Sequence, residues 1–280
     1  MKIIAGSSSP TLAKNLSAEL GVPLADVTIK RFPDSECYVR INERLDEAII
    51  VQNTYPDSNI IELFLLQDAA VKMGAKKISV VIPYYGYGRQ DRVFEEGEAV
   101  SSEKMAHLIE QDADLVVLIN PHKAYITNFF SINAKICDGM PSLANYFREK
   151  VDAVIAPDKG ALEMAKKAAG MIKCEYNHFE KTRISGSEVK MEIKDMDVKG
   201  KRLLVLDDIV STGGTMAKAV EILKQQGAGE IYAACIHGLF IKNADKRIMN
   251  AGCSKIVSTD TIESQYSMAS VAKELAKLLE

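Results

Sequence analysis

Short apolar runs rich in branched residues alternate with longer helical patterns along the chain, and this alternation constrains the fold most strongly. The runs show little polar alternation, which is typical of strands covered on both faces. Strands are predicted at residues 48–51, 78–82, 115–119, 153–156, 203–206 and 231–236. Helices are predicted at residues 59–73, 101–112, 161–169, 215–226 and 268–279, and Gly74 and Gly227 are stop signals for two of them. Alternating strands and helices predict an α/β fold with mostly parallel sheets flanked by helices.

The clearest break between predicted elements near the middle of the chain is the turn-forming run DGMP at residues 138–141. The strand–helix units before this run resemble those after it. A chain of 280 residues is long enough for two domains of ordinary size. We therefore predict two similar α/β domains, at residues 1–142 and 143–280.

Composition and charge exclude several classes of protein. Hydrophobic residues make up 47% and charged residues 26%, which is normal for a soluble globular protein. The net charge of −3 offers no general basic surface, so neither nucleic acid nor a membrane is expected as a partner. No apolar run approaches the ~20 residues that span a bilayer, and the N-terminus lacks the apolar core of a signal peptide. The five cysteines are scattered and never spaced as CxxC, which argues against disulfides and zinc. A cytoplasmic location is expected.

The most informative stretch is RLLVLDDIVSTGGT, at residues 202–215. An apolar strand is predicted to end at Asp207 and Asp208, and a turn of small residues then leads into a helix. Gly213 and Gly214 let an anion approach the backbone N–H groups, and the first turn of the helix adds unpaired donors. Further hydroxyl donors are Ser211, Thr212 and Thr215. The two carboxylates suit the hydroxyls of a sugar or metal-bound water. The stretch therefore predicts a loop that holds the phosphate of a phosphorylated ribose, at the carboxyl ends of the strands.

This stretch resembles the phosphoribosyl pyrophosphate loop shared by nucleobase phosphoribosyltransferases, ribose-phosphate pyrophosphokinases and some purine-responsive repressors. Other segments choose among these families: RFPDSE at 31–36, IPYYGYGRQDR at 82–92, NPH at 120–122, APDKG at 156–160, EKTRISGS at 180–187 and DTI at 260–262. In this order, over residues 1 to 265, they resemble the ribose-phosphate pyrophosphokinases (phosphoribosyl pyrophosphate synthetases).

The resemblance implies two phosphoribosyltransferase-like domains, with ATP bound in the first and ribose 5-phosphate in the second. The implied ATP-binding residues are Phe32, Asp34, Ser35, Glu36, Arg89 and Gln90, with Phe32 stacked on adenine. The implied catalytic residues are Lys181 and Arg183, on a mobile loop that closes over the transferring group. The implied ribose 5-phosphate-binding residues are Arg183, Asp207, Asp208, Ser211, Thr212, Gly213, Gly214 and Thr215. The implied magnesium-binding residues are His122 and Asp158.

The reaction that the resemblance implies is transfer of the β,γ-pyrophosphoryl group of ATP to the 1-hydroxyl of ribose 5-phosphate, giving phosphoribosyl pyrophosphate and AMP, with Mg²⁺ as the cofactor. It also implies a homodimer or a higher homo-oligomer built from dimers. The chain departs from the family pattern at Asn120 and Pro121, where the family more often has Asp-Leu, and at Ala161 and Met164, where it has Gly and Arg.

Two alternatives stay open at this point. A nucleobase phosphoribosyltransferase would need no ATP site and is normally a single domain about half this length. A non-catalytic regulator would be either a subunit resembling the synthetase or a ribose-phosphate-sensing repressor. A repressor needs a basic DNA-reading element, and a silent subunit would be expected to lose Lys181, Arg183 or the metal positions, which this chain keeps.

Overall fold

The computed structural model describes residues 1–183, 189–193 and 196–279, apart from the side chains at 181–183 and 189–192. The chain divides into two compact units. Unit 1 comprises Met1–Gly139, Asp260–Glu263 and the segment from Ser270 onward, and unit 2 comprises Met140–Thr259 and Ser264–Ala269. This division differs from the predicted one, because the chain returns to unit 1 near its end.

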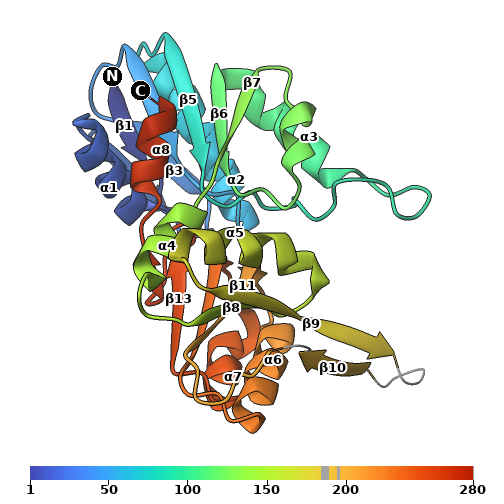
Figure 1. Ribbon diagram of the computed structural model, residues 1–280. Coiled ribbons are helices and arrows are strands. Elements are labelled where there is room, and N and C mark those ends of the chain that lie inside the picture. Colours follow the sequence, from blue (N-terminus) through green and yellow to red (C-terminus); the bar gives the residue numbers. More distant parts are fainter. Residues whose placement is uncertain (184–188, 194–195, 280) are drawn as a thin grey trace. The chain divides into compact units, whose positions relative to one another are not determined.

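Unit 1 is built on a parallel sheet, which in the described chain has the order β1-β4-β5-β6-β7 (Figure 1). Its strands are β1 (Lys2–Ala5), β4 (Glu47–Val51), β5 (Lys77–Ile82), β6 (Leu115–Ile119) and β7 (Asn133–Cys137). The central strands are buried on both faces, as their unbroken apolar runs predict. The predicted strand at 115–119 coincides with β6.

Helices cover both faces of this sheet. Helices α2 (Asp57–Lys72) and α3 (Ser101–Ile109) share one apolar core with the sheet, and the hairpin of β2 (Val27–Arg31) and β3 (Cys37–Ile41) packs against α2. Helices α1 (Pro10–Leu20) and α8 (Ala272–Leu279) pack together on the sheet, and α1 contacts β1 while α8 contacts β7. Two short 3-10 helices are η1 (Glu110–Asp112) and η2 (Ala124–Phe129).

Unit 2 contains a sheet whose order in the described chain is β10-β9-β8-β11-β12-β13-β14. Its strands are β8 (Ala153–Ala156), β9 (Glu175–Arg183), β10 (Val189–Ile193), β11 (Leu203–Val210), β12 (Ile231–Gly238), β13 (Lys255–Thr259) and β14 (Ser267–Ala269). The described pairings are parallel, except that β10 runs antiparallel to β9. Its helices are α4 (Met140–Phe147), η3 (Lys159–Ala161), α5 (Leu162–Ile172), α6 (Gly214–Gln225), η4 (Ile241–Asn243) and α7 (Ala244–Asn250).

The predicted α/β architecture with mostly parallel sheets is confirmed, and three local predictions are wrong. Strand β11 does not end at Asp207, because its pairing with β12 continues to Val210. The helix predicted to begin at Met268 begins at Ala272, because Ser267–Ala269 pairs with β13 instead. The chain up to Arg183, predicted as a mobile loop, belongs to strand β9. No helix in the described part of the chain is long and apolar enough to cross a bilayer.

Candidate active site

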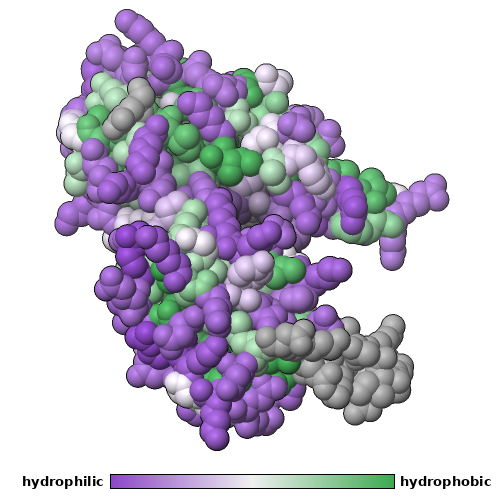
Figure 2. Space-filling model, in the orientation of Figure 1, coloured by the Kyte–Doolittle hydropathy of each residue, from purple (hydrophilic) through white to green (hydrophobic). Residues whose placement is uncertain are grey.

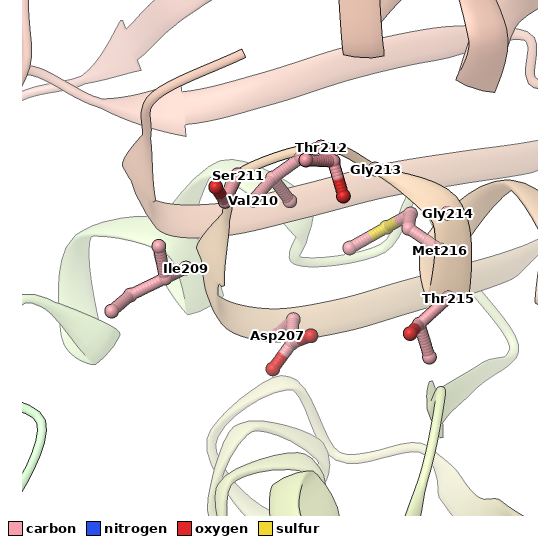
Figure 3. A pocket seen from close by; sticks show the side chains of 9 residues that line it. All are labelled: Asp207, Ile209, Val210, Ser211, Thr212, Gly213, Gly214, Thr215 and Met216. Atoms are coloured by element: carbon pink, nitrogen blue, oxygen red, sulfur yellow. The ribbon is translucent and has the colours of Figure 1, made fainter. Parts of the chain in front are cut away.

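A cavity of about 150 Å³ opens where β11 turns into α6 in unit 2 (Figure 3). Asp207 enters it from the strand and Thr215 from the first turn of the helix, and the backbone of the turn passes between them. Gly213 is the N-cap of α6 and has φ 69°, the left-handed region that favours glycine. A Cβ at Gly213 would lie 3.0 Å from the Cβ of Ala244 in α7. The close approach of α7 and the backbone conformation therefore both require glycine at this position.

The structure places most of the residues predicted for the ribose-phosphate loop around this one cavity. Those that line it are Asp207, Ser211, Thr212, Gly213, Gly214 and Thr215. Asp208 is not among its lining residues, and its Oδ1 accepts a hydrogen bond from the Ile209 N–H at 2.8 Å. Asp207 is thus the acid of the pair that faces the cavity.

The electrostatics of Asp207 are unusual for a carboxylate. Burial, followed by the negative charge of Asp208 and a hydrogen bond with it, raises the pKa of Asp207 from 3.8 to about 7. The charge of Asp158 makes a smaller contribution to this rise. The electrostatic potential at this cavity is therefore negative, which favours a ligand that brings hydroxyl donors or a cation to the carboxylates.

Arg247 is a contact of the loop that sequence reasoning missed. From α7 its guanidinium donates a hydrogen bond to the carbonyl oxygen of Thr212 at 2.8 Å. The contact puts a positive charge beside a loop that is predicted to hold a phosphate. In the sequence, Arg247 is one of several charged residues on a short helix, and no local pattern distinguishes it from the others.

Asp158, Lys181 and Arg183 also belong to unit 2. Asp158 follows β8, and its Oδ1 accepts a hydrogen bond from the Gly160 N–H at 2.9 Å, which caps η3. The backbone of Lys181 lies opposite Met191 and that of Arg183 opposite Val189, in the ladder of β9 and β10. The side chains of Lys181 and Arg183 lie outside the described part of the chain.

In unit 1, the predicted ATP segment forms the five-residue turn 32–36 between β2 and β3 (hereafter the 32–36 turn). Its side chains are exposed, and Phe32 is 45% exposed. The Oδ1 of Asp34 accepts a hydrogen bond from the Glu36 N–H at 3.0 Å, and Ser35 has φ 75°. The turn therefore presents one aromatic ring and two carboxylates to its surroundings.

Arg89 and Gln90 lie on the loop between β5 and α3, which projects from unit 1. Arg89 is exposed, whereas the amide of Gln90 donates to Glu98 Oε2 at 3.0 Å and so braces the loop. Figure 2 shows hydrophobic surface along this loop, where Val93 and Phe94 are 53% and 56% exposed.

Both predicted ATP segments contact the start of α2. Tyr87, from the β5–α3 loop, donates to the carboxylate of Asp57 at 2.9 Å. Arg31, at the end of β2, donates to the carbonyl oxygen of Ser58 at 3.5 Å. The N-terminal turn of α2 thus lies between the two segments.

His122 is exposed in the turn that follows β6. The preceding Asn120 donates from its amide to Asp138 at 3.1 Å and accepts from the Gly139 N–H at 2.7 Å. An aspartate could accept the second bond but could not donate the first, which accounts physically for asparagine at this departure from the family pattern. Among the described residues, no group of three or more His, Cys, Asp or Glu side chains is arranged to hold a metal ion.

Comparison with known proteins decides the family. The family described as the N-terminal domain of ribose phosphate pyrophosphokinase matches residues 1–112, and the phosphoribosyl transferase domain matches residues 131–271. The ribose-phosphate pyrophosphokinase of Pyrococcus abyssi is 43% identical over 272 residues, which is 95% of each chain. The chain belongs to the ribose-phosphate pyrophosphokinase family. Ribose-phosphate pyrophosphokinase 2 of Archaeoglobus fulgidus is 40% identical over 99% of each chain.

A solved structure agrees with the family assignment. The phosphoribosylpyrophosphate synthetase from Mycobacterium smegmatis superimposes with a TM-score of 0.85 at 28% identity, covering 99% of this chain and 97% of that one. The predicted pair of phosphoribosyltransferase-like domains and the predicted ribose-phosphate pyrophosphokinase activity are confirmed. The match extends over both halves of the chain, whereas a nucleobase phosphoribosyltransferase would need only one.

Proposed function

We propose that the cavity between β11 and α6 binds ribose 5-phosphate and that this ribose-phosphate pyrophosphokinase transfers the β,γ-pyrophosphoryl group of ATP to its 1-hydroxyl. The observation that carries the proposal is the set of loop residues around one cavity at the N-terminus of α6. Backbone N–H groups and hydroxyls at such a terminus suit a phosphate. Asp207 accepts hydrogen bonds from the ribose hydroxyls. Asp208 does not line the cavity, and its N–H donates to the carboxylate of Asp207 and so holds it in place.

ATP is assigned to unit 1. Phe32 offers an exposed ring for the adenine, and Asp34, Ser35 and Glu36 offer polar groups on the same turn. Arg89 supplies an exposed guanidinium for phosphate oxygens, and Gln90 orients the loop that carries it. Support for the assignment comes from the start of α2, which both segments contact.

Mg²⁺ is the proposed cofactor. The carboxylate of Asp158, whose charge raises the pKa of Asp207, suits a hard cation that takes oxygen ligands and shares its coordination with substrate phosphates. His122 is assigned to the same role through its ring nitrogen or through a bound water. When bound, the ion neutralises charge on the polyphosphate.

The remaining steps fall to residues of the chain. The loop holds the sugar phosphate so that its 1-hydroxyl is positioned for attack on the β-phosphorus, and AMP leaves. Lys181 and Arg183 are proposed to neutralise the negative charge of the transferring group, and Arg183 to contact the sugar phosphate as well. Two cations of this kind stabilise the transition state more than the ground state, because negative charge grows on the bridging and leaving oxygens.

A homo-oligomer built from dimers and a cytoplasmic location complete the proposal. The exposed apolar side chains of Val93 and Phe94 on a projecting loop support contact with another copy of the chain. The five cysteines of the described chain are unpaired, which is usual for proteins in a reducing compartment.

The test is an assay of purified protein with ribose 5-phosphate, ATP and magnesium. We expect AMP and phosphoribosyl pyrophosphate in equal amounts. Thr212→Val should raise the KM for ribose 5-phosphate alone, and Asp34→Ala the KM for ATP alone. Absence of AMP, or nucleotide formation from a nucleobase and phosphoribosyl pyrophosphate instead, would contradict the proposal.

A further inference from the structure

Glu62 is a buried carboxylate on the second turn of α2 to which no role has been assigned. Its side chain is 0% exposed. Burying a charge is costly unless the charge is paired and hydrogen-bonded, so the contacts of Glu62 indicate what its charge is for.

The first contacts of Glu62 hold the carboxylate itself in place. Its Oε1 accepts from the Ser7 N–H at 2.7 Å and from the amide of Gln52 at 3.0 Å, and its Oε2 accepts from the Ser7 hydroxyl at 2.7 Å. Gln52 is fixed in turn, because its Oε1 accepts from the N–H of Ser8 at 3.1 Å. The position of the charge is therefore set by the ends of β1 and β4, not by the 32–36 turn.

Two further contacts of Oε2 lie towards the 32–36 turn, and one of them is the Cys37 thiol, which donates to it at 3.9 Å. The other is Arg31. Nη2 of Arg31 lies 3.5 Å from Oε2 of Glu62, and Nη1 of the same guanidinium donates to the carbonyl oxygen of Ser35 at 3.4 Å. Ser35 has φ 75°, a conformation that residues other than glycine rarely adopt, so the turn needs contacts that hold it there. Arg31 is 37% exposed and would have many rotamers without a fixed anion to hold it.

We propose that Glu62 is a positioning residue for ATP: its buried charge holds Arg31, and Arg31 holds the backbone of the 32–36 turn in the shape that binds the nucleotide. The inference rests on the proposed ATP role of that turn. It assigns to Glu62 no contact with either substrate, so its effect should be confined to ATP.

The replacement Glu62→Gln isolates the charge. The amide oxygen of the new side chain can still accept from the Ser7 N–H and from Gln52, and its NH₂ group can donate to the Ser7 hydroxyl. The NH₂ group carries no negative charge and repels the Arg31 guanidinium. We expect the KM for ATP to rise about fivefold, the size of loss typical of one partly exposed ion pair. The kcat at saturating ATP should stay within about twofold and the KM for ribose 5-phosphate should not change, since the transferring groups are untouched.

Asp68→Asn is the matched control. Asp68 lies on the same helix and pairs with Lys72 at 2.7 Å, but its side chain is 53% exposed. Removing this charge should leave all kinetic constants unchanged.

Arg31→Gln should raise the KM for ATP as Glu62→Gln does. The double variant should have the same KM for ATP as Arg31→Gln alone, because both substitutions remove the same ion pair.

Asp34→Ala and Glu36→Ala separate this inference from the proposed ATP site. If neither changes the KM for ATP, the turn does not bind ATP and both proposals fail. If they raise it while Glu62→Gln and Arg31→Gln do not, the role of Glu62 alone is overturned. Should Glu62→Gln fail to fold, Arg31→Gln tests the same link from its exposed end, and an unchanged KM for ATP there overturns the inference.

Discussion

Asp207→Asn should make the free protein more stable at neutral pH while removing an acid from the proposed ribose site. The pKa of Asp207 is raised from 3.8 to about 7, chiefly by burial and then by the charge of Asp208. An unfolded chain loses this proton near its usual pKa, whereas the folded chain keeps it until about pH 7. Stability contributed by this group therefore falls as the pH rises from about 4 to about 7, and the full penalty is present above that range.

The size of the effect follows from the pKa difference. A difference of about three in pKa corresponds to about 4 kcal/mol as an upper limit, and the partial exposure of Asp207 reduces this to about 2 kcal/mol. Asparagine keeps the shape, since its Oδ1 can still accept from the Asp208 N–H, as Asp207 does at 2.9 Å. The variant should thus gain about 2 kcal/mol over the parent chain at about pH 8, and the gain should shrink towards zero at about pH 4.

Urea unfolding of both proteins across this pH range, in metal-free and phosphate-free buffer, measures the difference. Asp152→Asn is a control of opposite sign, because the hydrogen bond and charge of Arg202 lower the pKa of Asp152. That variant should lose stability at neutral pH. A gain for Asp207→Asn that is absent, or that does not vary with pH, would refute the assignment of an uncompensated acid to this cavity.

Three further predictions concern single residues. Lys181→Ala should lower kcat by about 10²- to 10³-fold with ribose 5-phosphate binding nearly kept, as measured by steady-state kinetics and calorimetry, and near-normal turnover would remove Lys181 from the mechanism. Gly213→Ala should lower the free energy of unfolding in urea by about 1–3 kcal/mol and weaken ribose 5-phosphate binding, because φ at Gly213 is 69° and the new Cβ would lie 3.0 Å from the Cβ of Ala244. The control Gly170→Ala, in α5 with open space around it, should not lower the free energy of unfolding. The pKa of the Cys37 thiol is raised by burial and then by the charge of Glu62, so Glu62→Gln should shift the pH profile of Cys37 alkylation to lower pH, and an unshifted profile would place the charge elsewhere.

The parts of the fold that could be predicted are those whose structure follows from local pattern. Strands β6 and β8 coincide with their predicted ranges, because continuous apolar runs leave no other buried arrangement. The hairpin β2–β3 and strands β1, β7, β9, β10, β13 and β14 were not predicted. Strands β2, β3 and β7 contain polar or half-exposed residues, and pairing with a neighbouring strand supplies what their own pattern lacks. Strands β1 and β13 are short and largely buried, and they are held in the sheet by their parallel neighbours.

The candidate site divides in the same way. The loop from Asp207 to Thr215 could be predicted because strand, acids, hydroxyls and glycines stand side by side in the sequence. Arg247 and Glu62 could not, because each is a single charged residue on a helix whose partner lies far away in the chain. Asn120 appeared in the sequence only as a departure from a family pattern, and its amide proves to bridge Asp138 and Gly139.

The most direct test of the central claim is a crystal structure of the protein with ribose 5-phosphate bound. The account predicts that the phosphate lies in the cavity lined by residues 209–216, against the backbone N–H groups at the start of α6, with the ribose hydroxyls directed to Asp207. A sugar phosphate bound away from this loop, or bound with its phosphate directed away from Gly213 and Thr215, would contradict it.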